Sequence, residues 1–436
     1  MVPPFNHVFQ YINIFSSIAF IKYTVLRVRY SFFSDIILAS AKIYYSYTFN
    51  LNIMKTHLLF SLKTTAIIFL FFLVQTAAAQ DATALYQEGI KLKNEKKSKD
   101  AVEKFKLAIA QKPSYTEALY EWGWCQNDLK DYTGAITNLR TVRKTWGNIP
   151  KVHFELGYAF EKTSQYDSAI QSYNECLRLK PDYSLGNKQL GYIAYNREDN
   201  KAALEHFAKY EANAKDEIKD YLYWYRKGFL QNAQKEYTGA IVSLKKSLDY
   251  KTDYTNTYLE LGFASNKLKL AEDAISYYKK AMELDPKSHI PYNGIGEVYR
   301  DTKKDMNEAM AWYQKTLGIN SKERKACFGM GYCLNSQARY IEAMNYLKTA
   351  IEQEPTYTAA FVEFGYSNYM LAKYTEAIEQ FNKALSLNPA NENARYYSCQ
   401  VYIKQRNKTM AQKMVDELKR LNSKHVATLQ PKVDAL

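Results

Sequence analysis

The segment TAAFVEFGYSNYMLAKYTEAIEQFNKALSLNPAN, residues 358–391, carries the pattern that decides the fold. Twelve residues after Gly365 comes Ala377, four further on comes Phe381, and Pro389 closes the segment. Small residues at a helix crossing let two backbones approach closely, and proline ends a helix because it cannot continue one. The segment therefore predicts two helices packed antiparallel across a short turn.

The same pattern recurs along most of the chain. Glycines in one register are spaced by 34 residues, apart from one step of 37 and one of 35, and they are Gly89, Gly123, Gly157, Gly191, Gly228, Gly262, Gly296, Gly331 and Gly365. Three extra residues fall around 213–219 and one falls in the seventh unit, while a tenth, weaker copy has Cys399 in place of glycine. One such unit cannot bury its own apolar faces, so we expect neighbouring units to stack around a continuous core.

This unit resembles the tetratricopeptide repeat, a helix-turn-helix module of 34 residues, and the resemblance covers about residues 82–421. It implies an all-α fold, a right-handed α-solenoid of about ten 34-residue repeats over residues 80–421, with a C-terminal tail at 422–436. In that family the first helix of each unit lines a concave groove. A binding surface for a partner protein is therefore expected along the first helices.

Residues 54–79 have the three parts of a secretory signal. Lys55 and Lys63 flank a polar start, residues 64–74 are uncharged and strongly apolar, and Ala77 and Ala79 bracket an A-x-A site before Gln80. The apolar run is shorter than the roughly 20 residues that a membrane-spanning helix needs. We expect cleavage after Ala79, an exported periplasmic or secreted protein, and no stable membrane insertion. Residues 1–53 are interpreted as a non-native or unstructured extension ahead of the true start.

The positive charge does not indicate a nucleic-acid partner. The formal charge is +14 over 436 residues, but residues 1–79 hold six basic residues and one acidic residue. From residue 80 on, 53 basic and 44 acidic side chains leave +9. The lysine-rich stretch 91–99 is interleaved with acidic residues and is interpreted as a solvated surface.

Catalytic and metal-binding patterns are not found in the sequence. Histidines from residue 80 on are far apart, there is no CxxC pair, and His153 occupies a helix-packing position. The five cysteines are scattered and odd in number, which favours buried free thiols over a disulfide framework, and they are Cys125, Cys176, Cys327, Cys333 and Cys399. No enzyme activity, metal or cofactor is expected.

Three positions of the unit form the candidate binding surface. Counting the recurrent glycine as position 8, the face of the first helix that comprises positions 2, 5, 6, 9, 12 and 13 is expected to line the groove. Position 9 is aromatic in seven of nine units, namely Trp124, Tyr158, Tyr192, Phe229, Phe263, Tyr332 and Tyr366. Position 6 supplies Glu121, Glu155, Glu260 and Glu363, and position 12 supplies Asn127, Asn232, Asn266 and Asn335.

Two interpretations of the aromatic residues stay open at this stage. They either pack mainly against the first helix of the neighbouring unit or bind an extended peptide or a glycan, for which aromatic faces and directed hydrogen bonds are well suited. The favoured function is a non-enzymatic protein-interaction scaffold of the bacterial cell envelope. The alternatives are an accessory module of a glycosyltransferase or another envelope enzyme complex, and direct glycan binding.

Overall fold

The computed structural model describes residues 51–214 and 216–436, and it places helices throughout both ranges with no strand in either. The chain divides into two compact units, residues 1–129 and residues 130–436. Residues 1–50 of the expected extension at 1–53 lie outside the described residues. The all-α prediction is confirmed.

The first unit contains α3 (Leu51–Asn94), α4 (Ser98–Gln111) and α5 (Thr116–Asp128). The C-terminal part of α3 packs against α4 and α5. This core contains Ala82, Ala101, Phe105 and Ala118, all of which are fully buried. The helix α3 runs without a break through the expected cleavage site after Ala79, and Leu62, Ile67 and Phe69 in its first half are exposed.

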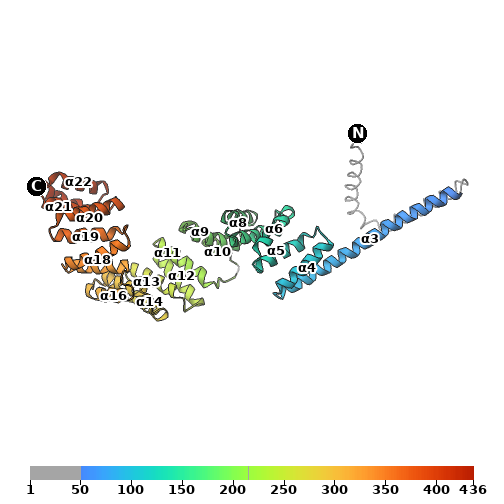
Figure 1. The fold of residues 1–436 in the computed structure, drawn as a ribbon, viewed down its shortest axis with the longest axis horizontal. Coiled ribbons are helices and arrows are strands. Elements are labelled where there is room, and N and C mark those ends of the chain that lie inside the picture. The colour runs from blue at the N-terminus through green and yellow to red at the C-terminus, as the bar shows by residue number, and fades with distance from the viewer. Residues whose placement is uncertain (1–50, 215) are drawn as a thin grey trace, which may run out of the picture. The chain divides into compact units, whose positions relative to one another are not determined.

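The second unit is built from successive helix pairs, which Figure 1 shows stacked one after another from α11 to α22. The helix α6 (Tyr132–Trp146) precedes the first complete pair. The first helices of the pairs are α7 (Pro150–Lys162), α9 (Ser184–Asn196), α11 (Tyr221–Ala233), α13 (Thr255–Lys267), α15 (Ile290–Val298), α17 (Arg324–Ser336), α19 (Thr358–Met370) and α21 (Glu392–Lys404). The second helices are α8 (Tyr166–Leu179), α10 (Asn200–Asn213), α12 (Tyr237–Tyr250), α14 (Ala271–Leu284), α16 (Met306–Ile319), α18 (Tyr340–Gln353), α20 (Tyr374–Leu387) and α22 (Lys408–Arg420).

The recurrent small and large residues make the core, as the pattern predicts. The recurrent alanine of the second helix is fully buried in all ten units, at Ala101, Ala135, Ala169, Ala203, Ala240, Ala274, Ala309, Ala343, Ala377 and Ala411. At Gly365 a Cβ atom would lie 2.5 Å from a ring carbon of Phe381, which is closer than real side chains approach. Glycine is therefore required where the large residue of the second helix crosses the first helix.

The two irregular steps of the repeat have separate structural causes. The three extra residues lie in the link between α10 and α11, which ends at Asp220, and the Asp220 carboxylate accepts hydrogen bonds from the backbone N–H groups of Leu222 and Tyr223. The single extra residue is absorbed by a π-helical turn, η2 (Tyr299–Lys303), directly after α15. Such a turn adds one residue to a helix without moving its neighbours out of register.

First helices of neighbouring pairs lie side by side. Contacts join α11 to α13, α13 to α15, α15 to α17, α17 to α19 and α19 to α21. Each second helix packs instead between its own first helix and the next one. The first helices therefore form one shared surface within the second unit, and that surface positions the candidate site.

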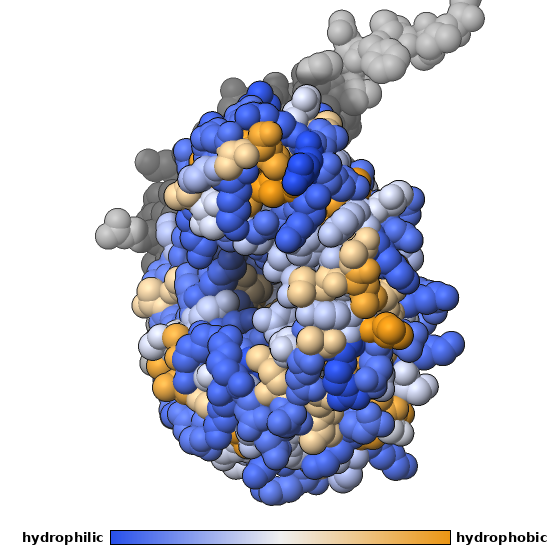
Figure 2. All heavy atoms as spheres, turned by 90° about the vertical axis from the view of Figure 1, so that its left-hand side faces the viewer, coloured by the Kyte–Doolittle hydropathy of each residue, from blue (hydrophilic) through white to orange (hydrophobic). Residues whose placement is uncertain are grey.

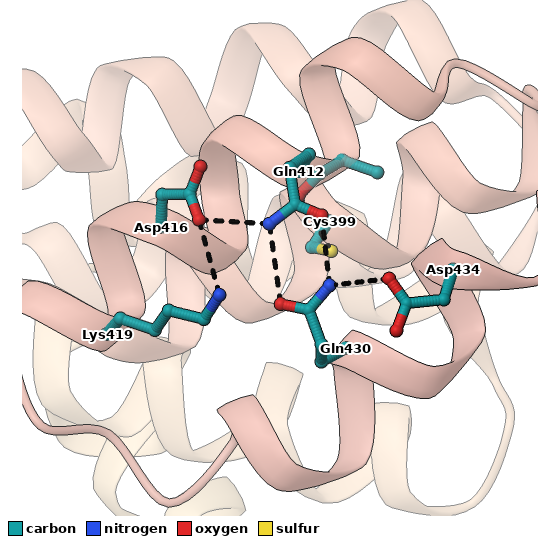
Figure 3. A network of polar contacts seen from close by, with 7 residues as sticks. Cys399, Gln412, Asp416, Lys419, Gln430 and Asp434 are labelled. Atoms are coloured by element: carbon teal, nitrogen blue, oxygen red, sulfur yellow. Dashed lines mark hydrogen bonds and ion pairs between the residues drawn. The ribbon is translucent and has the colours of Figure 1, made fainter.

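The last described helix, α23 (Val426–Asp434), covers the end of the second unit. Its Leu429 and Val433 are buried against α22, and a polar network reinforces the contact (Figure 3). The amides of Gln412 and Gln430 bond to each other, and the Gln430 amide also donates to Asp434 at 2.8 Å. The face seen in Figure 2 is correspondingly mostly hydrophilic, with hydrophobic patches that are small and separate.

Candidate functional site

The seven aromatic residues at position 9 are neither fully buried nor fully exposed. Three of them pack edge-on against a tyrosine that begins the preceding second helix, in the pairs Tyr132–Tyr158, Tyr237–Phe263 and Tyr340–Tyr366, with ring centroids 6.1–6.2 Å apart. Ring edges that meet in this geometry stabilise the contact between units. These three rings therefore contact the neighbouring unit at its second helix, where packing on its first helix was the expectation, and a part of each side chain remains accessible.

Cations of the chain itself lie over most of the same rings. In the first unit Lys93 Nζ lies 4.6 Å from the ring centroid of Trp124. In the second unit the pairs are Lys162 with Tyr158, Arg226 with Tyr192, Lys267 with Phe263 and Arg300 with Tyr332. Such contacts hold long basic side chains flat along the surface.

Two of the expected asparagines connect neighbouring first helices. Asn232 Nδ2 donates to Glu260 Oε2 at 2.8 Å and to the Glu260 backbone carbonyl at 3.1 Å. Asn335 makes the same pair of bonds to Glu363, at 2.9 and 3.0 Å. Position 12 of one unit is therefore coupled to position 6 of the next, which the sequence register did not predict.

The two carboxylates in these couples are strongly desolvated. Burial raises the pKa of Glu260, although the Asn232 amide and the charge of Lys325 act in the opposite direction. Burial likewise raises the pKa of Glu363, against the Asn335 amide and the charge of Arg300. Each couple thus holds a carboxylate whose charge is only partly compensated.

The remaining predicted residues have other partners. Glu121 forms an ion pair with Lys93 at 2.5 Å, and Asn266 Oδ1 accepts a hydrogen bond from Thr302 Oγ1 at 2.8 Å. The Tyr192 hydroxyl donates to Asp220 Oδ2 at 3.2 Å. Asn127 is buried in α5, and Glu155 lies half-buried in α7.

A groove of about 660 Å³ brings four of the predicted residues together on α11 and α13. These are Phe229, Asn232, Glu260 and Phe263. The groove continues onto α15, where Asn293 and Glu297 line it, and reaches Lys325 at the start of α17. We take this groove, within the second unit, as the candidate binding site.

Several residues of this groove were not among the predicted site residues. Tyr225 and Asn293 stand at position 5 of their units, while Ile290 and Lys325 stand at position 2. Both positions belong to the helical face that was expected to line the groove. Reading those two positions along the repeats would therefore have found them.

A larger depression, of about 1040 Å³, lies mainly on the second helices α6 and α8. Four of its charged side chains pair with one another, since Arg178 pairs with Glu175 at 2.7 Å and Arg197 pairs with Asp167 at 2.8 Å. It contains none of the aromatic, carboxylate and amide positions that form the groove. We therefore do not take it as the binding site.

The histidine and cysteine predictions can be compared directly with the structure. His153 is buried, and its Nε2 donates to the Gly147 carbonyl at 2.7 Å, which confirms a packing role. All five cysteines are buried free thiols, and burial raises the pKa of Cys125 to about 12. Across the described ranges, no group of three or more His, Cys, Asp or Glu side chains is arranged to hold a metal ion.

None of the helices in residues 51–214 and 216–436 combines the length and the apolarity that a membrane crossing requires.

Comparison with known families identifies the repeats. Tetratricopeptide repeat models match residues 117–148, 150–183, 255–288, 325–357 and 371–432. These segments are tetratricopeptide repeats, and three of the five lie in the part of the second unit that contains or follows the groove. Together with the observed helix pairs they establish a helical-repeat solenoid.

Curated relatives match parts of the chain. A TPR repeat-containing protein of Methanocaldococcus jannaschii is 25% identical over 54% of this chain and 45% of its own length. The Hsp70-Hsp90 organizing protein of Triticum aestivum is 25% identical over 55% of this chain and 41% of its own. The type IV pilus assembly protein PilF of Pseudomonas aeruginosa is 28% identical over 30% of this chain and 53% of its own. The chain thus spans about half or less of the length of these relatives.

Among solved structures, the alignment with the APC/C hetero-tetramer Cut9-Hcn1 covers 82% of this chain and 97% of the matched chain, at 12% identity and a TM-score of 0.47.

Proposed function

We propose that this protein is a non-enzymatic scaffold that binds an extended segment of a partner protein in the groove on α11, α13 and α15. The observation that carries the proposal is the convergence of Phe229, Asn232, Glu260 and Phe263 on one open surface of the first helices. Half-buried rings offer contact area at a low cost in side-chain entropy, and the carboxylate and amide groups orient a bound main chain.

Photo-crosslinking tests the location of the partner. A benzophenone side chain placed at Phe229 should give a discrete crosslinked product in intact cells, and the same group at Ile341, which is exposed on the second helix α18, should not. Replacing Phe263 with alanine should abolish the product at Phe229 while the circular dichroism spectrum is unchanged. Equal crosslinking at both positions would contradict a groove on the first helices.

The proposed location of this scaffold is outside the cytoplasm, in the cell envelope or beyond it. The support is the signal-like segment 54–79 and the similarity to a pilus assembly protein. Processing after Ala79 would remove residues 51–79 of α3, including the exposed residues 61–69, and leave the residues that pack against α4. N-terminal sequencing of the exported protein should begin at Gln80, and a mature form that retains Lys63 would contradict this proposal.

A further inference from the structure

The groove on α11, α13 and α15 contains two buried hydrogen-bond acceptors that no donor of the described residues reaches. Asn232 Nδ2 is used by Glu260, and Asn293 Nδ2 donates to Glu297 Oε1 at 3.0 Å. Both asparagines are almost fully buried, at 5% and 7% exposure, and the side-chain oxygen of each has no hydrogen-bond partner. The two orphaned amide oxygens lie on residues that bond to Glu260 and Glu297, so this part of the lining favours a hydrogen-bond donor.

The carboxylates in this groove have no counter-ion within ion-pair distance, although Lys325 acts on Glu260 and Arg300 acts on Glu297 from farther away. Glu211 is paired with Lys227 at 2.6 Å, for example. Neither Glu260 nor Glu297 forms an ion pair with any cation of the described residues. Lys235 and Lys325 line the same groove but are exposed, and burial still raises the pKa of Glu260 despite the charge of Lys325.

One aromatic wall of the groove is also unoccupied by a cation. Phe229 is 36% exposed, and no lysine or arginine in the described part of the chain lies over its ring. The neighbouring Phe263, in contrast, has Lys267 Nζ 5.2 Å from its ring centroid. An open phenylalanine face beside desolvated carboxylates attracts a cation through both the ring quadrupole and the charge.

We propose that the groove selects an extended segment that carries an arginine side chain, whose guanidinium is bound by the carboxylates of Glu260 and Glu297 and stacks on Phe229. A guanidinium supplies several N–H donors in a plane and is less strongly hydrated than an ammonium group, so it suits a lining of acceptors and a ring face. Lysine should bind in the same place more weakly. This inference rests on the proposed function, since it names the chemistry of the segment that the groove binds.

The test starts from a random nine-residue peptide array probed with the wild-type chain. The selected peptides should be enriched in arginine, and then in lysine, relative to the library. The best peptide is next compared by calorimetry with its citrulline analogue, which keeps the shape of arginine but has no charge. We expect the citrulline peptide to bind about tenfold more weakly or worse, because a desolvated charge pair is lost.

Variants connect this preference to the groove. In the double variant Glu260→Gln and Glu297→Gln, most of the affinity difference between the arginine and citrulline peptides should be lost, and only the contribution of the Phe229 ring should remain. The matched control is Glu379→Gln on the exposed face of α20, which should keep the full difference. If the array selects no peptide at all, the proposed function itself fails. If it selects peptides without a basic preference, or if the citrulline analogue binds equally to the wild type, only the arginine inference is overturned.

Discussion

Single residues of the groove combine burial with charge, and Glu260 shows this most clearly. Its carboxyl has a pKa above the ordinary value of 4.5, mainly because of burial. At a pH between the pKa of Glu260 in the unfolded state and its higher pKa in the folded state, the folded state binds more protons than the unfolded state. The stability that this residue contributes is therefore greatest below pH 4.5 and falls as the pH rises through the folded pKa.

We expect Glu260→Gln to increase the stability of α13 at pH 7 and to leave it nearly unchanged at pH 4. The glutamine oxygen can still accept the hydrogen bond from Asn232, but it has no charge to desolvate. Amide hydrogen exchange in α11 and α13, corrected for the intrinsic rate at each pH, measures the effect. Glu379→Gln should give no difference between the two pH values, and a loss of protection in Glu260→Gln at pH 7 would contradict the argument.

A second prediction at the residue scale concerns glycine at position 6. A Cβ atom at Gly329 would lie 2.3 Å from Cζ of the fully buried Tyr313, so Gly329→Ala should lower the free energy of unfolding by about 1–3 kcal/mol. Where leucine replaces this tyrosine, as at Leu244, the corresponding position holds a glutamate, Glu260. Tyr313→Leu should therefore relieve the clash.

The measurement is a double-mutant cycle by denaturant unfolding. Gly329→Ala should cost less in the Tyr313→Leu background than in the wild type, because the two residues are in contact. Gly318→Ala serves as the control, since no atom lies within 4 Å of its added Cβ atom, and it should raise stability by about 0.5–1 kcal/mol. Additive effects of the Gly329 and Tyr313 substitutions would contradict direct contact.

At the scale of elements, the helices were predictable and their turns were not. The periodic glycines, alanines and large residues give the helix pairs because the same contacts recur in every unit. The turn between the two helices of a pair places one residue at positive φ, and no glycine marks it, since the residues there include Lys235, Lys269, Ala338 and Ala372. The π-helical turn η2 also left only a one-residue change in spacing as its signal.

Where a residue other than glycine has a positive φ, substitution by glycine is expected to increase the stability of the protein. Ala372 has φ 56° in the turn between α19 and α20, where an alanine costs roughly 1–2 kcal/mol relative to its right-handed conformation. Ala372→Gly should raise the free energy of unfolding by about 1 kcal/mol after the entropy of the unfolded glycine is subtracted. Ala311→Gly in the middle of α16 is the same change on an exposed helix face, and it should lower stability by about 1 kcal/mol. A loss of stability at both positions in thermal unfolding would contradict the prediction.

The candidate site shows the same division between what sequence predicts and what only packing decides. Helical periodicity correctly placed Phe229, Asn232, Glu260 and Phe263 on one face. It could not distinguish these from Tyr192 or Glu121, because those side chains are engaged by Asp220 in the link before α11 and by Lys93 of α3. Which members of a repeated position stay open for a partner depends on such contacts between elements.

At the scale of the molecule, a solenoid unit transmits little from end to end because each helix pair contacts only its neighbours. A truncation at one end of this unit should therefore lower the stability of the adjacent helices only. The helix α23 tests this, since its Leu429 and Val433 cover the apolar side of α22, including Val415 and Leu418.

Removing residues 425–436 should lower the stability of α21 and α22 by about 3–5 kcal/mol, because two buried aliphatic side chains and the surface that they cover are lost. Hydrogen exchange should show lost protection from residue 392 onward and unchanged protection in α11, α13 and α15, and peptide affinity of the groove should change by less than about twofold. Gln430→Ala removes only the hydrogen bonds of Gln430 within the network of Figure 3 and should cost about 1 kcal/mol. Loss of protection throughout residues 150–420 in the truncated chain would instead mean that the second unit unfolds as one cooperative block.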